Sequence, residues 1–192
     1  MLPGSYEDNT FDILGMDPGS NKFGFSLLEV NIDNLDLVSS VAWTIDANDL
    51  AKNFQTVLET HGDRMARIHG LQNYIYKILN IYNPLYVTSE APFINNRFPA
   101  AGIALTEVLS TIRQALIEYD PEKELYLIPP SNVKNAVKAK GGDDKIVIKQ
   151  KVCALDLKYK GDVNIENLDE HSIDALAVGY AKLLDLRSQE GL

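Results

Sequence analysis

Residues 13–29 read ILGMDPGSNKFGFSLLE, and this stretch decides the fold. An apolar run from Phe11 to Met16 predicts a strand that ends at Asp17, where the following Pro-Gly pair forces a turn. A second strand is expected from Lys22 to Val30, so the carboxylate of Asp17 is left at the rim of a sheet. In this position Asp17 either accepts hydrogen bonds from its own turn or has a functional role.

The rest of the chain predicts more strands and the helices that flank them. In chain order, the expected elements are a strand at Leu35–Thr44, one or two helices within 48–82 with weak points at Gly62 and Gly70, a strand at Leu85–Ser89, a helix at Ala101–Tyr119, a strand at Leu125–Ile128, lysine-bearing helices around 131–140 and 145–157, and a helix at Glu170–Leu186. The first three strands form an antiparallel meander, and the last two alternate with helices. The predicted fold class is α/β with one mixed five-stranded sheet, in which sites gather at the ends of the parallel strands.

Length and composition limit the possible classes of protein. A chain of 192 residues with 45% hydrophobic side chains predicts a single domain at residues 11–192, after a flexible leader at residues 1–10. No apolar stretch approaches the roughly 20 residues of a membrane-spanning helix, and no secretory leader is recognisable. Cys153 is the only cysteine, which excludes an internal disulfide and a cysteine-based zinc site. We therefore expect a cytoplasmic protein without a membrane partner.

The charge of the chain is unevenly distributed. Lysine and arginine number 18 against 27 acidic residues, a formal net charge of −9 that argues against a nucleic-acid partner. Residues 131–160, however, hold eight lysines and three aspartates, a balance of +5 that leaves −14 for the remainder. This basic segment is either a solvated helical surface or a binding face for a polyanion.

Four residues form a candidate metal-ligand set. Glu90 ends a strand that is apolar on both faces, where a carboxylate must be paired, bound to a metal or exposed. His171 and Asp174, three residues apart at a helix start, project on one face. Taken alone, that segment is equally explained by Asp169 as an N-cap and His171 as a surface residue. Together with Asp17, the set supplies the ligands of two divalent ions, for which magnesium is best suited.

The motifs that carry this set resemble a known family. They are ILGMDPGSNKFGFSLLE at 13–29, VTSEAPF at 87–93, IPPSNVKNAVKAKGGDDKIVIKQKV at 128–152 and HSIDALAVGYA at 171–181. From Phe11 to Leu184 the chain resembles the RuvC-type Holliday junction resolvases of the RNase H-like superfamily. The resemblance implies an endonuclease that cuts four-way junctions by two-metal in-line hydrolysis with paired symmetric nicks. A less selective enzyme that also cuts forks and flaps is an open alternative.

The resemblance also assigns residues to these roles. Asp17, Glu90, His171 and Asp174 would bind two Mg²⁺ ions, for which Mn²⁺ can substitute. Phe93, three residues after the glutamate, would meet junction bases, and the predicted contacts to DNA are made by Phe93, Lys134, Lys138, Lys140, Lys145 and Lys149. Paired cutting of a twofold-symmetric junction requires a homodimer, for which the apolar stripe of the helix at Ala101–Tyr119 is a candidate unless it packs in the core.

Three other functions are alternatives to the junction resolvase. A DxG turn between strands also occurs in actin-like and sugar-kinase folds, but those need two such domains, and the chain holds one such turn. An RNase H acting on RNA–DNA hybrids shares the predicted fold, and an inactive junction-binding scaffold would be expected to lose an acidic ligand.

Asp143 and Asp144 interrupt the basic segment and are expected to weaken its positive field.

Overall fold

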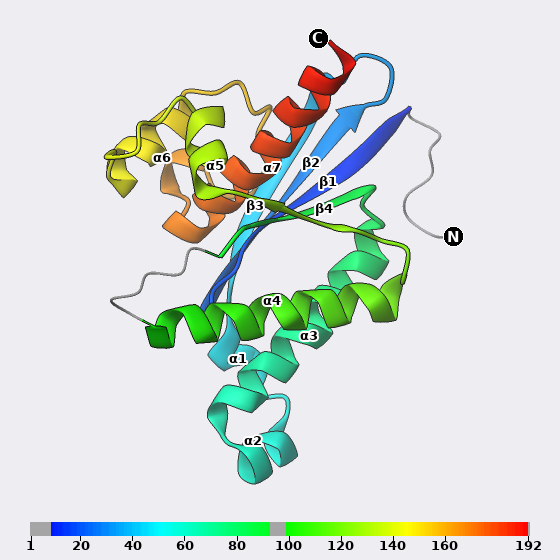
Figure 1. The fold of residues 1–192 in the computed structure, drawn as a ribbon, viewed down its shortest axis with the longest axis vertical. Coiled ribbons are helices and arrows are strands. Elements are labelled where there is room, and N and C mark those ends of the chain that lie inside the picture. Colours follow the sequence, from blue (N-terminus) through cyan, green and yellow to red (C-terminus); the bar gives the residue numbers. More distant parts are fainter. Residues whose placement is uncertain (1–8, 93–98, 192) are drawn as a thin grey trace.

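The computed structural model describes residues 9–92 and 99–191 and centres on a five-stranded sheet (Figure 1). Its strand order is β3-β2-β1-β4-β5. The strands are β1 (Thr10–Asp17), β2 (Lys22–Asn31), β3 (Leu37–Asp46), β4 (Tyr86–Glu90) and β5 (Leu125–Ile128). β1, β2 and β3 pair antiparallel, whereas β4 runs parallel to both β1 and β5. The predicted mixed five-stranded sheet is confirmed.

Helices cover both faces of this sheet. They are α1 (Ala47–Ala51), α2 (Gln55–His61), α3 (Asp63–Tyr82), α4 (Pro99–Tyr119), α5 (Pro130–Ala136), α6 (Lys145–Cys153) and α7 (Glu170–Glu190), with a short 3-10 turn at Ile165–Asn167. Figure 1 shows α5, α6 and α7 on one side of the sheet and α1 to α4 on the other. In the described part of the chain, no helix is long and apolar enough to cross a membrane.

Each face of the sheet has its own hydrophobic core because side chains alternate along a strand. On β1, Phe11 and Ile13 pack with the inner face of α7, whereas Leu14 and Met16 pack with α3 and α4. Ser26 on β2 is fully buried, and its hydroxyl donates to the backbone carbonyl of Ala175 at 2.7 Å. This bond fixes α7 against the strands that lead to Asp17.

The predicted helix at 48–82 is divided differently from the expectation. The chain breaks at Gly62, which adopts a positive φ of 84°, but Gly70 lies inside α3 and does not interrupt it. A Cβ at Gly70 would lie 2.8 Å from Cβ of Leu50, so this glycine allows α1 and α3 to pack closely. The expectation that Gly70 is a weak point was therefore wrong.

The apolar stripe on α4 is used inside the molecule. Val108, Leu109, Ile112 and Leu116 are all buried in the core between the sheet, α3 and α4. Core packing therefore accounts for this stripe, one of the two alternatives that the sequence left open.

Candidate active site

The four predicted ligand residues meet at one edge of the sheet. Asp17 ends β1 and Glu90 ends β4, and because these neighbouring strands are parallel, their carboxyl ends lie together. His171 and Asp174 occupy the first turns of α7, whose start lies against β2 at Gly24. All four side chains line one pocket of about 540 Å³. Residues separated by up to 157 positions in sequence thus share one site.

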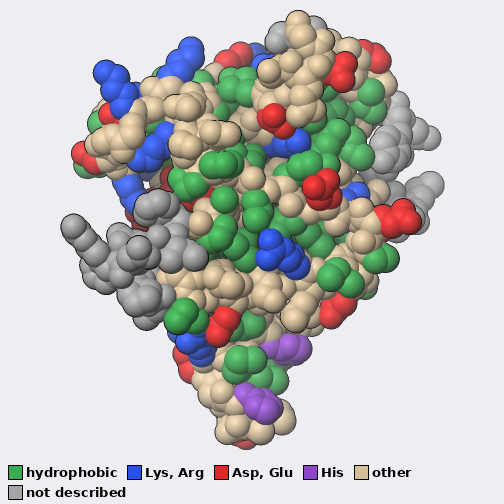
Figure 2. All heavy atoms as spheres, viewed as in Figure 1, with side chains coloured by type: hydrophobic (Ala, Val, Ile, Leu, Met, Phe, Trp, Pro, Cys, Tyr) green, Lys and Arg blue, Asp and Glu red, His purple; other side chains and the backbone are tan. Residues whose placement is uncertain are grey.

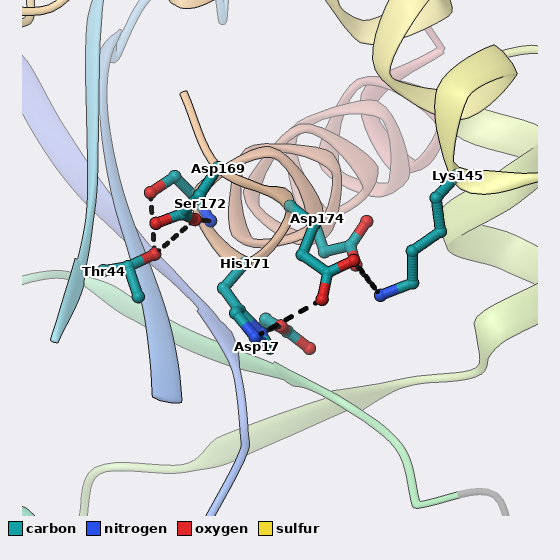
Figure 3. A network of polar contacts seen from close by, with 8 residues as sticks. Asp17, Thr44, Lys145, Asp169, His171, Ser172 and Asp174 are labelled. Atoms are coloured by element: carbon teal, nitrogen blue, oxygen red, sulfur yellow. Dashed lines mark hydrogen bonds and ion pairs between the residues drawn. The ribbon is translucent and has the colours of Figure 1, made fainter. Parts of the chain in front are cut away.

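The start of α7 is fixed by a network of hydrogen bonds (Figure 3). Asp169 is the N-cap, as one alternative proposed, and its carboxylate accepts from the backbone N–H of Ser172 at 2.9 Å. Thr44 of β3 donates to Asp169 at 2.7 Å and lies 2.8 Å from the Ser172 hydroxyl. Gly24 permits the close approach of β2, since a Cβ there would lie 2.1 Å from the carbonyl oxygen of His171. These contacts set the direction in which His171 points.

His171 points toward Asp17 (Figure 3). Its Nδ1 lies 2.8 Å from Oδ2 of Asp17, and since an ionised carboxylate only accepts, the imidazole is the donor. This hydrogen bond raises the pKa of His171 above its usual value, although burial acts in the opposite direction. The contact places a positive charge beside the carboxylates when His171 is protonated.

The two remaining carboxyl groups are destabilised as anions. Burial, followed by repulsion from Asp17 and Asp174, raises the pKa of Glu90 to about 7. Burial, followed by repulsion from Asp17, raises the pKa of Asp174 to about 6. A cation between these groups would relieve the repulsion, so the oxygen and imidazole donors of the pocket fit a divalent ion.

The pocket is not already arranged as a closed metal cage. Among residues 9–92 and 99–191, no three His, Cys, Asp or Glu side chains have the geometry to hold a metal ion. Asp17 is instead paired with His171, and Asp174 lies 3.8 Å from Nζ of Lys145. Binding of a cation would require these internal partners to be exchanged.

Two of the predicted DNA-binding lysines line the same pocket. Lys145 begins α6, and its Nζ lies 2.9 Å from Oε2 of Glu170. Lys134 of α5 donates from Nζ to the backbone carbonyl of Gly141 at 3.2 Å. Lys134 and Lys145 therefore face the carboxylates from α5 and α6, in a part of the lining that also includes Asp143 and Asp144. Lysines in this place suit the phosphates of a polyanion.

The other predicted lysines lie outside the pocket lining. Lys138 and Lys140 are exposed in the connection between α5 and α6, where Lys138 adopts a positive φ of 58°. Lys149 donates from Nζ to the carbonyl of Leu168 at 2.6 Å and so connects α6 to the segment before α7. Figure 2 shows Lys and Arg side chains gathered over the region of α5 and α6.

Asp143 and Asp144, the two aspartates that interrupt the basic segment before α6, have structural partners. Asp143 accepts from Nζ of Lys151 at 2.6 Å and from the backbone N–H of Lys140 at 2.7 Å. The bond from Lys151 lowers the pKa of Asp143. Asp144 is the N-cap of α6 and accepts from the N–H of Val147 at 2.9 Å. The charge of Asp143 is therefore compensated locally.

Two site contributors were not identified from the sequence, and one predicted residue cannot be placed. Glu170 and Thr44 contact the site through partners that are 25 and 125 positions away, and no local spacing reveals such pairs. Phe93 lies outside the described residues, so its predicted contact with DNA bases stays a prediction.

The arrangement of the mixed sheet and its flanking helices matches the RNase H-like fold of RuvC. No protein-family model matches the sequence. Among solved structures, RuvC from Thermus thermophilus has a TM-score of 0.65 at 19% identity, with 94% of this chain and 96% of that chain covered. The same enzyme in complex with a Holliday junction substrate gives a TM-score of 0.63 at 17% identity, with the same coverage.

A eukaryotic structure shares the same architecture. The yeast mitochondrial Holliday junction resolvase Ydc2 has a TM-score of 0.55 at 12% identity, with 94% of this chain and 84% of that chain covered. At these identities the similarity establishes the fold, and the chemistry has to be argued from the pocket.

Proposed function

We propose that this protein is a metal-dependent endonuclease that resolves four-way DNA junctions and acts on related branched DNA. One observation carries the proposal. On the fold of RuvC, three carboxylates and a histidine from β1, β4 and α7 line a pocket that also contains Lys134 and Lys145. Acidic groups suit divalent cations, and the lysines suit the phosphates of a nucleic acid.

The proposed ligands are Asp17, Glu90, His171 and Asp174. Divalent cations held there, with Mg²⁺ as the expected ion and Mn²⁺ as a substitute, would activate water and stabilise charge on the departing oxygen. Asp17 orients the His171 ring through its hydrogen bond, and loss of the Nδ1 proton would free that nitrogen as a ligand. Glu90 and Asp174 gain stability as anions once a cation offsets the repulsion that both experience from Asp17.

The proposed DNA contacts extend outward from the pocket. Lys134 and Lys145 stand nearest to the carboxylates, and the exposed Lys138 and Lys140 continue the positive surface along the connection from α5 to α6. Lys149 and Phe93 complete the proposed set, Lys149 as a phosphate contact and Phe93 as an aromatic that stacks on an unpaired base.

A homodimer is part of the proposal because one domain carries one site, whereas a junction is resolved by two symmetric nicks. The buried stripe of α4 is occupied by core packing, so a dimer contact on this helix would use its outer face. Ile103 and Ile117 are 60% and 63% exposed there. These two side chains are suitable for a twofold contact between α4 helices.

The test is cleavage of a labelled synthetic four-way junction, compared with a fork, a linear duplex and an RNA–DNA hybrid, each with Mg²⁺ and with chelator. Symmetric junction nicks that vanish with chelator are expected. Cleavage of the hybrid alone would instead indicate an RNase H, and junction binding without any cutting would indicate a scaffold.

A further inference from the structure

Glu170 is a carboxylate at the site that the proposed ligand set does not use. It is the first residue of α7, directly after the N-cap Asp169, and it does not line the acidic pocket. Its Oε2 lies 2.9 Å from Nζ of Lys145, and its Oε1 lies 3.7 Å from Nε2 of His171. Glu170 therefore contacts the site from the outside, through one lysine and one imidazole.

The lysine that it contacts is the one closest to the carboxylates. Lys145 lies 3.8 Å from Asp174, and Figure 3 shows its side chain reaching from α6 toward the start of α7. Because Lys145 has two acidic neighbours, its positive charge is partly offset within the protein. A DNA phosphate can form a close ion pair with this lysine only by replacing the carboxylate of Glu170.

The exposure of the pair makes such an exchange feasible. The side chain of Lys145 is 61% exposed and that of Glu170 is 52% exposed. Ion pairs at this degree of exposure are weak and are screened by salt, so stability does not depend on them. The pair is thus accessible to a DNA backbone, yet it competes with the backbone at low ionic strength.

Other lysines of the basic segment at residues 131–160 have partners of a different chemical type. Lys134 and Lys149 donate to backbone carbonyls, which are uncharged. Lys151 pairs with Asp143 through side chains that are only 29% and 19% exposed. Of the two pocket-lining lysines, Lys145 alone is paired with an acidic side chain of α7 in the part of the chain that is described.

We propose that Glu170 is an internal competitor of DNA: it holds Lys145 in the free protein, and a backbone phosphate replaces its carboxylate when branched DNA binds. This inference rests on the proposed function, since it takes branched DNA as the ligand. It assigns Glu170 a role in setting affinity and its salt dependence, separate from that of the proposed ligands.

The test is equilibrium binding of a fluorescent four-way junction in chelator, so that no cleavage or metal binding enters the readout. Glu170→Gln should tighten binding about two- to fivefold at low salt, the range that an exposed ion pair can supply, and the gain should shrink as salt rises. Glu166→Gln removes the same charge from an exposed position that has no contact with Lys145, and it should change affinity less.

A double-mutant cycle separates a specific effect from a general one. In a Lys145→Gln background, Glu170→Gln should have little further effect, because the competed lysine is gone. An equal gain in both backgrounds, or weaker binding by Glu170→Gln, would overturn the inference while leaving the proposed function intact. Failure of the wild-type protein to prefer the junction over linear duplex would overturn both.

Discussion

The two ends of β1 each carry an aspartate, but their surroundings differ. Asp12 lies opposite Glu29 of β2, and burial, followed by repulsion from Glu29, raises the pKa of Asp12 to about 6. Asp17 lies opposite Gly24, which lets α7 approach and places His171 against the carboxylate. Both aspartates are partly buried, but among residues 9–92 and 99–191 a cationic partner is found only beside Asp17. The pairing of acids with His171 and Lys145, rather than burial itself, distinguishes the candidate site.

The largest expected effect comes from removing the charge of Asp17, at the end of β1 that carries the candidate site. Asp17→Asn should reduce junction cleavage at least about 100-fold, since a proposed ligand and the partner of His171 are lost together. Junction binding in chelator should stay at the wild-type level or tighten, because one negative charge is removed near the DNA. Gel-based cleavage and binding assays measure both quantities, and retained cation-dependent cutting would remove Asp17 from the site.

The second prediction concerns the close packing of α7 against β2. In Gly24→Ala the new methyl group would meet the carbonyl of His171, and overpacking of this kind costs about 1–3 kcal/mol. Thermal unfolding should therefore shift down by several degrees, with cleavage reduced as well. Gly141→Ala is the matched control, because a Cβ there meets nothing within 4 Å. Equal melting temperatures for the two variants would contradict the close approach.

A smaller effect is expected from Lys134, a lysine of the pocket lining. Lys134→Gln should weaken junction binding a few-fold and reduce the slope of log affinity against log salt by about one. Lys77→Gln, an exposed lysine on α3 across the sheet, should change neither. Binding isotherms at several salt concentrations decide this, and identical slopes for wild type and Lys134→Gln would exclude Lys134 as a phosphate contact.

The smallest effect concerns the other end of β1 and has a defined sign. The folded pKa of Asp12 is about 6 against an ordinary value of 3.8, so folding favours its protonated form. Stability is then lost as pH rises from about 4 through 6, and Asp12→Asn should remove that loss. After allowance for solvent screening, we expect a gain of about 1 kcal/mol at pH 8, or about 2–4 °C in melting temperature, and none at pH 3.

Thermal melts at the two pH values test this prediction. An Asp12→Asn variant that is stabilised equally at pH 3 and pH 8 would show that its effect does not come from the charge. Junction cleavage by this variant should match the wild type, since Asp12 lies at the opposite end of the strand from Asp17.

The sequence predicted the sheet and the grouping of the four residues that line the acidic pocket, because both leave local signals. The apolar runs of β1 and β4 end directly at Asp17 and Glu90, and the spacing of His171 and Asp174 follows from helix geometry. The break at Gly62 was predicted from the sequence, whereas the continuity of α3 through Gly70 was not, since Gly70 serves a close contact with Leu50 that only the tertiary structure reveals. The partners Glu170 and Thr44 were missed for the same reason.

The central claim is that the carboxylates at the ends of β1 and β4 hold a divalent cation. The most direct test measures binding of Mn²⁺ to the protein, with electron paramagnetic resonance used to detect the ion that stays free. Wild type and Asp12→Asn should bind Mn²⁺ alike, whereas Asp17→Asn should lose this binding, because Asp17 belongs to the proposed cation site and Asp12 does not. Equal Mn²⁺ binding by Asp17→Asn and wild type would contradict the claim that the carboxylates at the ends of β1 and β4 hold the metal.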